Sequence, residues 1–193
     1  MNIEFELKII VDHHEVVERL QSLGALRVQL ETLMRRYVFE VSRDSSGFCK
    51  TLRVRDEGHG NVTLSLKSFN GLQSIDSVRE VELKVSDFDT AVDFVQNLGY
   101  LQNQYVENYR QTWKFNDCCI MLDRWPWIEP FIEIEGGDEQ SVRQVVALLG
   151  LQNRVCHYGP TARLYLEKYG ITIQEFNHNK LLTFQKKPDW RTL

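Results

Sequence analysis

The sequence is poor in cysteine and proline, with only four of each in 193 residues. The cysteines do not have the spacing of zinc ligands, and two of them, Cys118 and Cys119, are neighbours whose side chains would point to opposite faces of a strand. We therefore expect no zinc centre and interpret the cysteines as reduced thiols in a cytoplasmic protein.

The sequence also lacks long apolar runs and an excess of positive charge. No apolar run reaches the length of a membrane span, and the chain begins with a charged segment that leaves no room for a signal peptide. The formal net charge of -4 indicates that the whole molecule is not built to attract nucleic acid. We therefore expect a globular protein without membrane or nucleic-acid partners, an interpretation that the 42% hydrophobic content supports.

Paired carboxylates mark the first segment of the chain. Glu4, Glu6 and Lys8 alternate with apolar residues from Ile3 to Ile9, which is the period of a half-buried strand. Carboxylates two residues apart stand side by side on one sheet face, where they repel each other unless a cation lies between them. A strand whose charged face lies in solvent would show the same alternation.

The pattern recurs twice, so three unrelated strands that each turn a charged face to solvent are a poor explanation. It returns at residues 80–84 and, without the lysine, at residues 133–135. Each copy precedes a predicted amphipathic helix that ends at Leu-Gly, and these helices span residues 12–23, 87–98 and 138–149. Three strands with carboxylates on one face suggest that the faces converge on a shared, cation-rich interior.

Basic side chains alternate along the remaining strand-like segments. Arg53 and Arg55 precede a predicted hairpin turn at residues 58–61, Lys67 follows it, and Arg110 lies in a later segment. A dry core cannot hold so many charges, whereas a large barrel open at its ends can. The predicted fold class is α+β: an eight-stranded antiparallel β-barrel, forming a tunnel, with helices packed on the outside. We expect a single domain over residues 1–193, with a core of about 1–151 and a C-terminal helix and tail at 152–193.

The acidic and the basic residues are suited to two parts of one ligand, a divalent cation and the polyphosphate that it binds. Clustered carboxylate oxygens bind hard cations such as Mg²⁺ or Mn²⁺, which bridge to phosphate oxygens. Arginine and lysine on facing strands would neutralise the rest of a polyphosphate. Structural ion pairs between strands would explain the same residues, so spacing alone leaves both interpretations open.

The ordered motifs resemble those of the CYTH superfamily, the triphosphate tunnel metalloenzymes, which include class IV adenylyl cyclases, thiamine triphosphatases and inorganic triphosphatases. The resemblance covers about residues 1–151 and depends on the order of several motifs. These are Glu4-x-Glu6-x-Lys8, Arg53-x-Arg55, Leu64-Ser65-Leu66-Lys67, Arg79-Glu80-x-Glu82, Tyr109-Arg110, Leu122-Asp123 and Glu133-x-Glu135.

The resemblance implies a tunnel that binds a triphosphate along its axis together with Mg²⁺ or Mn²⁺. The implied metal ligands are Glu4, Glu6, Asp123, Glu133 and Glu135. The implied substrate-binding residues are Lys8, Arg53, Arg55, Lys67, Lys84, Arg110 and Lys114, and the implied catalytic set is Lys8, Arg53, Arg55, Lys67, Arg110 and Asp123. Hydrolases of the family often use a basic residue near the C-terminus, for which Lys168, Lys180, Lys186 and Lys187 are available.

Three functions are compatible with these residues. The first is metal-dependent hydrolysis of inorganic triphosphate or of a small organic triphosphate such as thiamine triphosphate or a nucleotide. The second is a class IV adenylyl cyclase, which converts ATP to cyclic AMP and pyrophosphate. The third is a non-catalytic binder of polyphosphate or nucleotides. Trp125 and Trp127 could stack on a base or a thiazolium ring, or pack in the core or rim. The sequence leaves the substrate, the preferred metal and the oligomeric state open.

Overall fold

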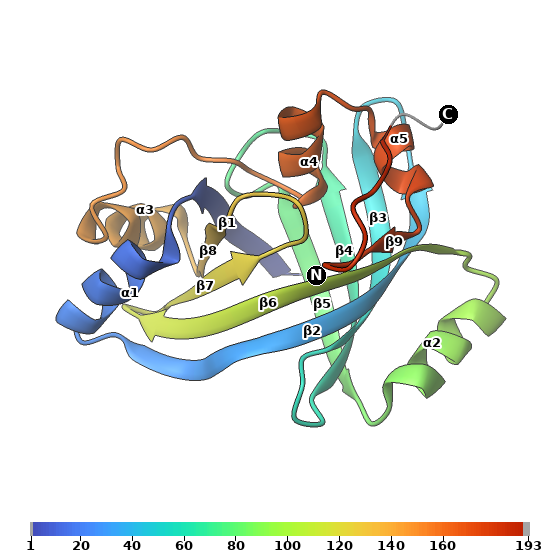
Figure 1. Cartoon of the computed structure of the whole chain (residues 1–193), viewed down its shortest axis with the longest axis horizontal. Helices are drawn as coiled ribbons and strands as arrows, with labels where there is room; N and C mark the ends of the chain where they lie inside the picture. The colour runs from blue at the N-terminus through green and yellow to red at the C-terminus, as the bar shows by residue number, and fades with distance from the viewer. Residues whose placement is uncertain (1, 191–193) are drawn as a thin grey trace.

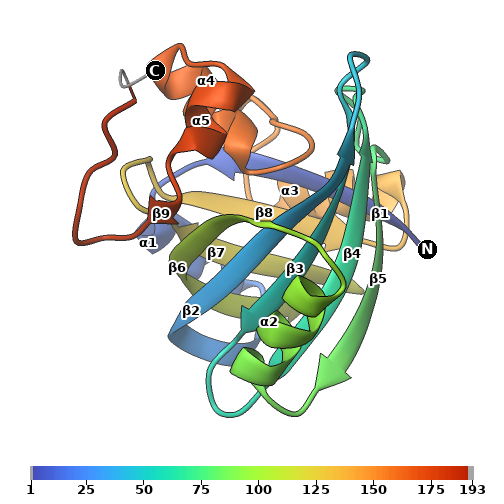
Figure 2. The same cartoon turned by 90° about the vertical axis from the view of Figure 1, so that its right-hand side faces the viewer.

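In the computed structural model of the chain, which describes residues 2–190, eight strands close into an antiparallel barrel (Figures 1 and 2). The order around the barrel is β2-β3-β4-β5-β1-β8-β7-β6, and pairing of β6 with β2 closes it. The predicted fold is confirmed. The strands are β1 (Asn2–Ile10), β2 (Leu26–Arg43), β3 (Phe48–Asp56), β4 (Val62–Asn70), β5 (Val78–Val85), β6 (Gln102–Phe115), β7 (Cys118–Arg124) and β8 (Phe131–Gly136).

The three predicted strand–helix units are present. The helices are α1 (His13–Ser22), α2 (Phe88–Asn97) and α3 (Glu139–Leu148). Each begins after an aspartate whose side chain accepts a backbone N–H of the first turn, and each ends at a leucine followed by a glycine with positive φ. The aspartates are Asp12, Asp87 and Asp138, and the glycines are Gly24, Gly99 and Gly150.

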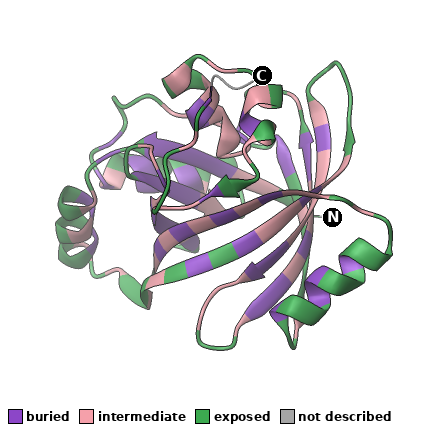
Figure 3. Ribbon diagram, turned by 45° about the vertical axis from the view of Figure 1, so that its right-hand side comes forward, coloured by how far each residue is buried: buried purple, intermediate pink, exposed green. Residues whose placement is uncertain are grey.

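The hydrophobic core lies between the barrel wall and these helices, because the alternating strands turn their apolar faces outward. α1 and α3 pack on β1, β7 and β8, where Leu7, Ile120 and Ile134 are fully buried. α2 packs on the other side of the barrel, on β3 and β4, through Phe88 and its neighbours. In Figure 3 only the barrel-facing side of α2 is buried. The interior of the barrel is therefore left to the polar faces of the strands.

The C-terminal segment packs over one end of the barrel (Figure 2). It forms α4 (Ala162–Tyr169), α5 (Ile173–His178) and the two-residue strand β9 (Leu181–Leu182), which pairs in parallel with β6. The predicted fourth helix is thus confirmed, and it ends at Gly170 with φ of 63°. Tyr165, Phe176 and Trp190 pack together against the barrel. No helix within residues 2–190 has the length and apolar composition that spanning a bilayer requires.

We predict that the outward faces of β8 and β5 contribute very differently to stability. Ile134 on β8 is fully buried beneath the helices, whereas Leu83 on β5 is 60% exposed. Ile134→Ala should lower the free energy of unfolding by about 2–5 kcal/mol, because it leaves a cavity. Leu83→Ala should change it by less than about 0.5 kcal/mol. Urea denaturation followed by circular dichroism measures both, and equal effects would contradict the described packing.

Candidate active site

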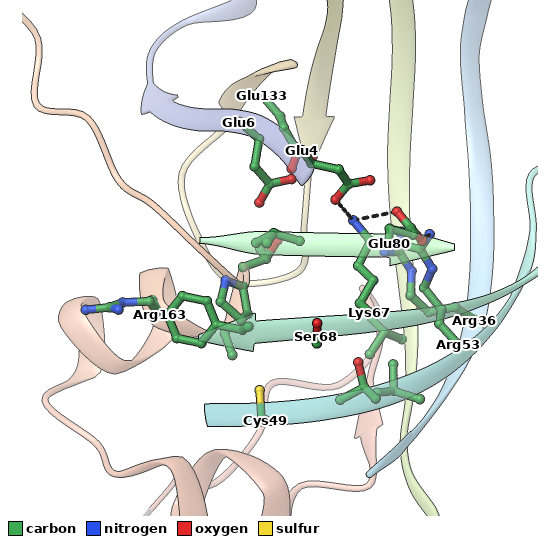
Figure 4. A pocket seen from close by; sticks show the side chains of 18 of the residues that line it. Glu4, Glu6, Arg36, Cys49, Arg53, Lys67, Ser68, Glu80, Glu133 and Arg163 are labelled. Atoms are coloured by element: carbon green, nitrogen blue, oxygen red, sulfur yellow. Dashed lines mark hydrogen bonds and ion pairs between the residues drawn. The ribbon is translucent and has the colours of Figure 1, made fainter. Parts of the chain in front are cut away.

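The barrel encloses a cavity of about 970 Å³ whose wall carries acidic and basic side chains (Figure 4). Nine residues predicted from the sequence line this cavity: Glu4, Glu6, Lys8, Arg53, Arg55, Lys67, Arg110, Glu133 and Glu135. Glu80 and Glu82, which the recurring carboxylate pattern also predicts to face the interior, line it too, and the structure adds Arg36, Arg43, Arg163 and Glu167. These side chains come from seven strands and from α4, so they meet only because the barrel closes.

Strand register places most of the carboxylates along β1, β5 and β8. Glu6 lies opposite Glu135, and Lys8 lies opposite Glu133, in the antiparallel β1–β8 pair. Glu80 lies opposite Lys67 in the β4–β5 pair. We call Glu4, Glu6, Glu80, Glu133 and Glu135 the acidic wall.

Two lysine ammonium groups lie between carboxylates of the acidic wall. Lys67 Nζ lies 3.0 Å from Glu4 Oε2 and 2.9 Å from Glu80 Oε2 (Figure 4). Lys8 Nζ lies 3.0 Å from Glu6 Oε1 and 2.9 Å from Glu133 Oε1. The cations between the carboxylates are thus the protein's own, and they bridge carboxylates of neighbouring strands rather than the predicted pairs within one strand.

Two lysines do not neutralise the five carboxyl groups of the acidic wall. Some of these carboxyl groups therefore have raised pKa values. Burial raises the pKa of Glu4 to about 8 against the attraction of Lys67, and the adjacent Glu80 carboxylate adds to the rise. Burial also opposes ionisation of Glu80, but Lys67 and Arg53 outweigh it and hold the Glu80 pKa below its ordinary value. The two carboxyl groups therefore titrate together as a pair, in which Glu4 keeps its proton to a higher pH than Glu80.

A second carboxyl pair behaves in the same way. Burial raises the pKa of Glu6 against the attraction of Lys8, and the Glu133 carboxylate adds to the rise. For Glu133, Lys8 and Arg110 outweigh burial and lower the pKa. Burial also raises the pKa of Glu135, despite the attraction of Lys67. Among residues 2–190 no hydrogen bond or ion pair engages the Glu135 side chain, so it is the least committed member of the acidic wall.

Guanidinium groups gather on the other side of the cavity. Arg36 is 4% exposed, and its guanidinium stacks over the Trp125 ring at 4.7 Å and donates to Asn108. Burial lowers the pKa of Arg36 well below its ordinary value, and Arg53, Arg55 and Arg110 lower it further. Burial and the neighbouring Arg53 also lower the pKa of Arg55, to about 10. Arg53 pairs with Glu80 and Glu82 at 2.9 and 3.2 Å, and Arg55 pairs with Glu57 and Glu82. Within the described part of the chain Arg36 has no ion pair, so its charge is the one that no adjacent carboxylate balances.

The same arginines have unused donors. The Nε atoms of Arg36, Arg53 and Arg55 are buried and lack hydrogen-bond partners within the described part of the chain. An unsatisfied buried donor is costly, and a charged one more so. We call Arg36, Arg53 and Arg55 the arginine cluster. Both the unpaired charge of Arg36 and the free donors of the cluster suit a polyanion with several acceptor oxygens.

Asp123 does not have the position that the sequence predicted for a metal ligand. It is fully buried behind Arg110 and does not line the cavity. Arg110 Nε and Nη2 donate to its two oxygens at 3.0 and 2.6 Å, and Asn108 donates to it at 2.8 Å. In this structure Asp123 orients Arg110, because the bidentate pair uses both carboxylate oxygens.

Lys84 and Lys114 are also absent from the cavity lining. Both are exposed, and both lie near the end of their strand, Lys84 opposite Thr63 and Lys114 opposite Leu26 and Cys119. They share the inward-facing period of their strands but lie beyond the enclosed part of the barrel. The predicted substrate contacts of these two lysines therefore have no support in the geometry.

Sequence reasoning did not place Arg36 or Arg163 in the cavity lining, and it left Glu80 without a binding role. Arg36 lies opposite Arg55 in the β2–β3 pair, a register that alternation within β2 alone does not reveal. Glu80 was recognised as an interior residue but not as part of the binding set, although it carries the same paired pattern as Glu4. Arg163 on α4 reaches the cavity and lies 5.9 Å from the Phe69 ring, whereas the candidate C-terminal lysines do not line it (Figure 4).

The carboxylate oxygens of the acidic wall are the kind of donor that a divalent cation requires. Within residues 2–190 the acidic, histidine and cysteine side chains form no ready-made group of three that could hold a metal ion. What the structure provides is two carboxyl pairs that titrate together and the uncommitted Glu135, all with the hard oxygen donors that Mg²⁺ and Mn²⁺ prefer. A bound cation would take over the neutralising role of the bound protons and of Lys67.

Comparison with known proteins decides the family. The CYTH domain family matches residues 2–161. The chain belongs to this family. CYTH proteins bind small triphosphates, and the family implies a divalent metal. No curated protein matches the chain.

Several solved CYTH-like structures share the fold. A conserved hypothetical protein from Pyrococcus furiosus has a TM-score of 0.70 at 23% identity, with 83% of this chain and 99% of that chain covered. A Vibrio parahaemolyticus protein described as a candidate adenylate cyclase has a TM-score of 0.67 at 16% identity, covering 85% and 98%. A Hippeastrum protein described as a candidate adenylyl cyclase with a dominant triphosphatase activity has a TM-score of 0.54 at 16% identity, covering 97% and 100%. At these identities the comparisons show a common fold.

We predict that Glu4 makes the metal-free protein less stable at higher pH. Its pKa is raised to about 8 in the folded protein, so folding becomes less favourable as the pH rises from the unfolded-state pKa of 4.5 through that value. Glu4→Gln should reduce the loss of melting temperature between pH 5 and pH 9, measured in the presence of a chelator. The exposed Glu15→Gln variant is the control, and an identical pH dependence for Glu4→Gln and wild type would contradict the assignment.

Proposed function

We propose that this protein is a divalent-metal-dependent phosphohydrolase that acts on a triphosphate bound in the barrel. The arginine cluster carries this proposal, because Arg36 has no ion pair and the Nε donors of all three arginines lack partners within the described part of the chain. A triphosphate offers several charged acceptor oxygens along one chain, which meets both deficits. The acidic wall opposite the cluster supplies oxygen donors for the metal.

The proposal gives each group of residues a role. Arg36, Arg53 and Arg55 bind phosphate oxygens, and Arg110, oriented by Asp123, adds a fixed donor. Glu4, Glu6 and Glu135 would hold Mg²⁺ or Mn²⁺, with Glu133 and Glu80 beside them. The ion would stabilise negative charge on the phosphates and lower the pKa of a bound water. Lys8 and Lys67 then have phosphate oxygens as alternative partners to the carboxylates.

The chemistry of the proposal is an in-line displacement at the terminal phosphorus. The water oxygen forms a bond to phosphorus while the bond to the bridging oxygen breaks, and that oxygen leaves with the electron pair. The water proton passes to a carboxylate of the acidic wall, and orthophosphate and the shortened phosphate chain are released. The arginine cluster lowers the barrier because its donors are already positioned for the charge on the phosphate oxygens.

An adenylyl cyclase is the second candidate, and the Vibrio neighbour's description and the large cavity favour it. In that reaction the ribose 3′-hydroxyl attacks the α-phosphorus of ATP, and pyrophosphate leaves. In this reaction too, the arginines would bind the phosphate oxygens and the carboxylates would hold the metal. The Hippeastrum neighbour's description favours hydrolysis as the first candidate. We further propose a cytoplasmic location, with a small-molecule triphosphate rather than nucleic acid or membrane as the partner.

Product analysis tests the proposal. The purified protein is incubated with tripolyphosphate, ATP and thiamine triphosphate, with Mg²⁺ and separately with Mn²⁺. We expect metal-dependent release of orthophosphate.

Glu135→Gln should lower turnover by more than the ~10–100-fold that loss of an outer-shell partner causes, because it removes a ligand. Lys114→Gln, outside the cavity, should leave turnover unchanged. Cyclic AMP and pyrophosphate from ATP would establish the cyclase instead, and no product from any substrate would favour a binder.

A neighbouring pair of arginines provides a matched test of phosphate binding. Arg36 faces the cavity, whereas Arg35 is exposed and pairs with Asp56 at 3.1 Å. Arg36→Gln should weaken binding of tripolyphosphate about 10–100-fold, since hydrogen bonds to charged groups contribute about 1.5–3 kcal/mol. Arg35→Gln should leave the affinity within about twofold of wild type. Isothermal titration calorimetry measures both, and equal affinities for the two variants would contradict the assigned phosphate site.

A further inference from the structure

One part of the cavity lining carries no charge. It is formed by Val38 on β2, Val106 on β6 and Trp125 after β7, with Ile173 and Phe176 of α5 beside them. We call these five residues the apolar wall. Strand register explains its position, because Val38 lies opposite Arg53 and Val106 lies opposite Arg36. The apolar wall therefore adjoins the arginine cluster directly.

The helix that completes the apolar wall is anchored to the barrel. Gln104 on β6, directly opposite Val38, donates its side-chain N–H to the carbonyl of Asn179 at 2.8 Å and to that of Phe176 at 3.4 Å. Gln104 is 4% exposed, and its carboxamide lines the cavity. Asn103 and Asn177 add two more carboxamides to the lining. This side of the cavity thus combines apolar surface with a few uncharged polar groups.

The composition and size of this region do not match an inorganic triphosphate. Tripolyphosphate has no apolar surface to place against Val38, Val106 and Phe176, and its charges are better placed at the arginine cluster. The cavity of about 970 Å³ is at the upper end of the ~300–1,000 Å³ typical of pockets for organic ligands. Apolar walls with a few fixed polar groups are the usual lining of such pockets.

We propose that the apolar wall binds the organic group of the substrate, so that the protein acts on an organic triphosphate in preference to inorganic triphosphate. This inference rests on the proposed function, and it identifies Val38 and Ile173 as residues that determine specificity. The organic group has apolar surface for these side chains and polar atoms that the carboxamides of Asn103, Gln104 and Asn177 can bind. The triphosphate chain extends from it onto Arg53 and Arg36, which are the cross-strand neighbours of Val38 and Val106.

Two variants of the apolar wall test the proposal. Val38→Phe fills the space beside Arg53, and Ile173→Ala removes apolar contact from α5 without adding bulk. Binding is measured by calorimetry in the presence of Mg²⁺ with imidotriphosphate and with the β,γ-imido analogues of ATP and of thiamine triphosphate, none of which has the terminal P–O–P bond that hydrolysis would break. We expect wild type to bind at least one organic ligand about tenfold or more tighter than imidotriphosphate, because filling an apolar pocket contributes about 1–3 kcal/mol.

The two variants should change the affinity for the organic ligand but not the affinity for imidotriphosphate. Val38→Phe should weaken that organic ligand about tenfold or more, and Ile173→Ala should weaken it severalfold, while imidotriphosphate affinity stays within about twofold. Leu83→Phe, on the exposed outer face of β5 and outside the cavity lining, is the control for the added ring.

Two outcomes would overturn the proposal while leaving the proposed function intact. One is wild-type binding of imidotriphosphate at least as tight as that of both organic ligands. The other is that the variants weaken all ligands equally or none. Failure of wild type to bind any of the three would instead remove the proposed function, and this inference with it.

Discussion

The structure depends on how the charged side chains inside the barrel are balanced. A closed barrel that turns its ionic faces inward must balance those charges at close range, because water is limited there. The acidic wall meets this constraint with Lys8, Lys67 and the raised pKa values of Glu4 and Glu6. The arginine cluster meets it only in part, since Arg53 and Arg55 pair with carboxylates whereas Arg36 has no ion pair among the described residues and the Nε donors of all three are free. This imbalance is the feature that points from a stable fold to a ligand.

The outer surface follows from the same alternation. Strands with ionic inner faces have apolar outer faces, and these need cover. α1 and α3 cover β1, β7 and β8, while α2 covers part of β3 and β4. The Asp–Leu–Gly boundaries of the three helices fix where each begins and ends. The helices therefore carry the hydrophobic core, and the interior is free to be a polar cavity.

Local periodicity was sufficient to predict the barrel, the three strand–helix units and nine of the residues that line the cavity. Period-two alternation identifies which face a residue takes, but it does not show how deep along the tunnel that residue lies. Lys84 and Lys114 take the inward period and yet lie at strand ends, where the barrel no longer encloses them. Depth is set by register and strand tilt, which require the pairing of distant segments.

The other differences arise from contacts between elements. Asp123 has the residue type of a metal ligand, but its two oxygens are used by Arg110 on the adjacent strand. Arg36 and Arg163 enter the cavity from β2 and α4 through pairing and packing that a single sequence does not display. The roles of all these residues in binding remain our proposals, whereas their positions are features of the fold.

The most direct test of the account is whether metal and triphosphate bind cooperatively through opposite walls of the cavity. Binding of imidotriphosphate, which resists hydrolysis, would be measured with and without Mn²⁺, and the Mn²⁺ would be followed by electron paramagnetic resonance. The account predicts that each ligand raises the affinity for the other by the same factor, about tenfold or more, and that Glu135→Gln reduces this coupling. Equal affinity for imidotriphosphate with and without Mn²⁺, together with an unchanged Mn²⁺ spectrum, would contradict it.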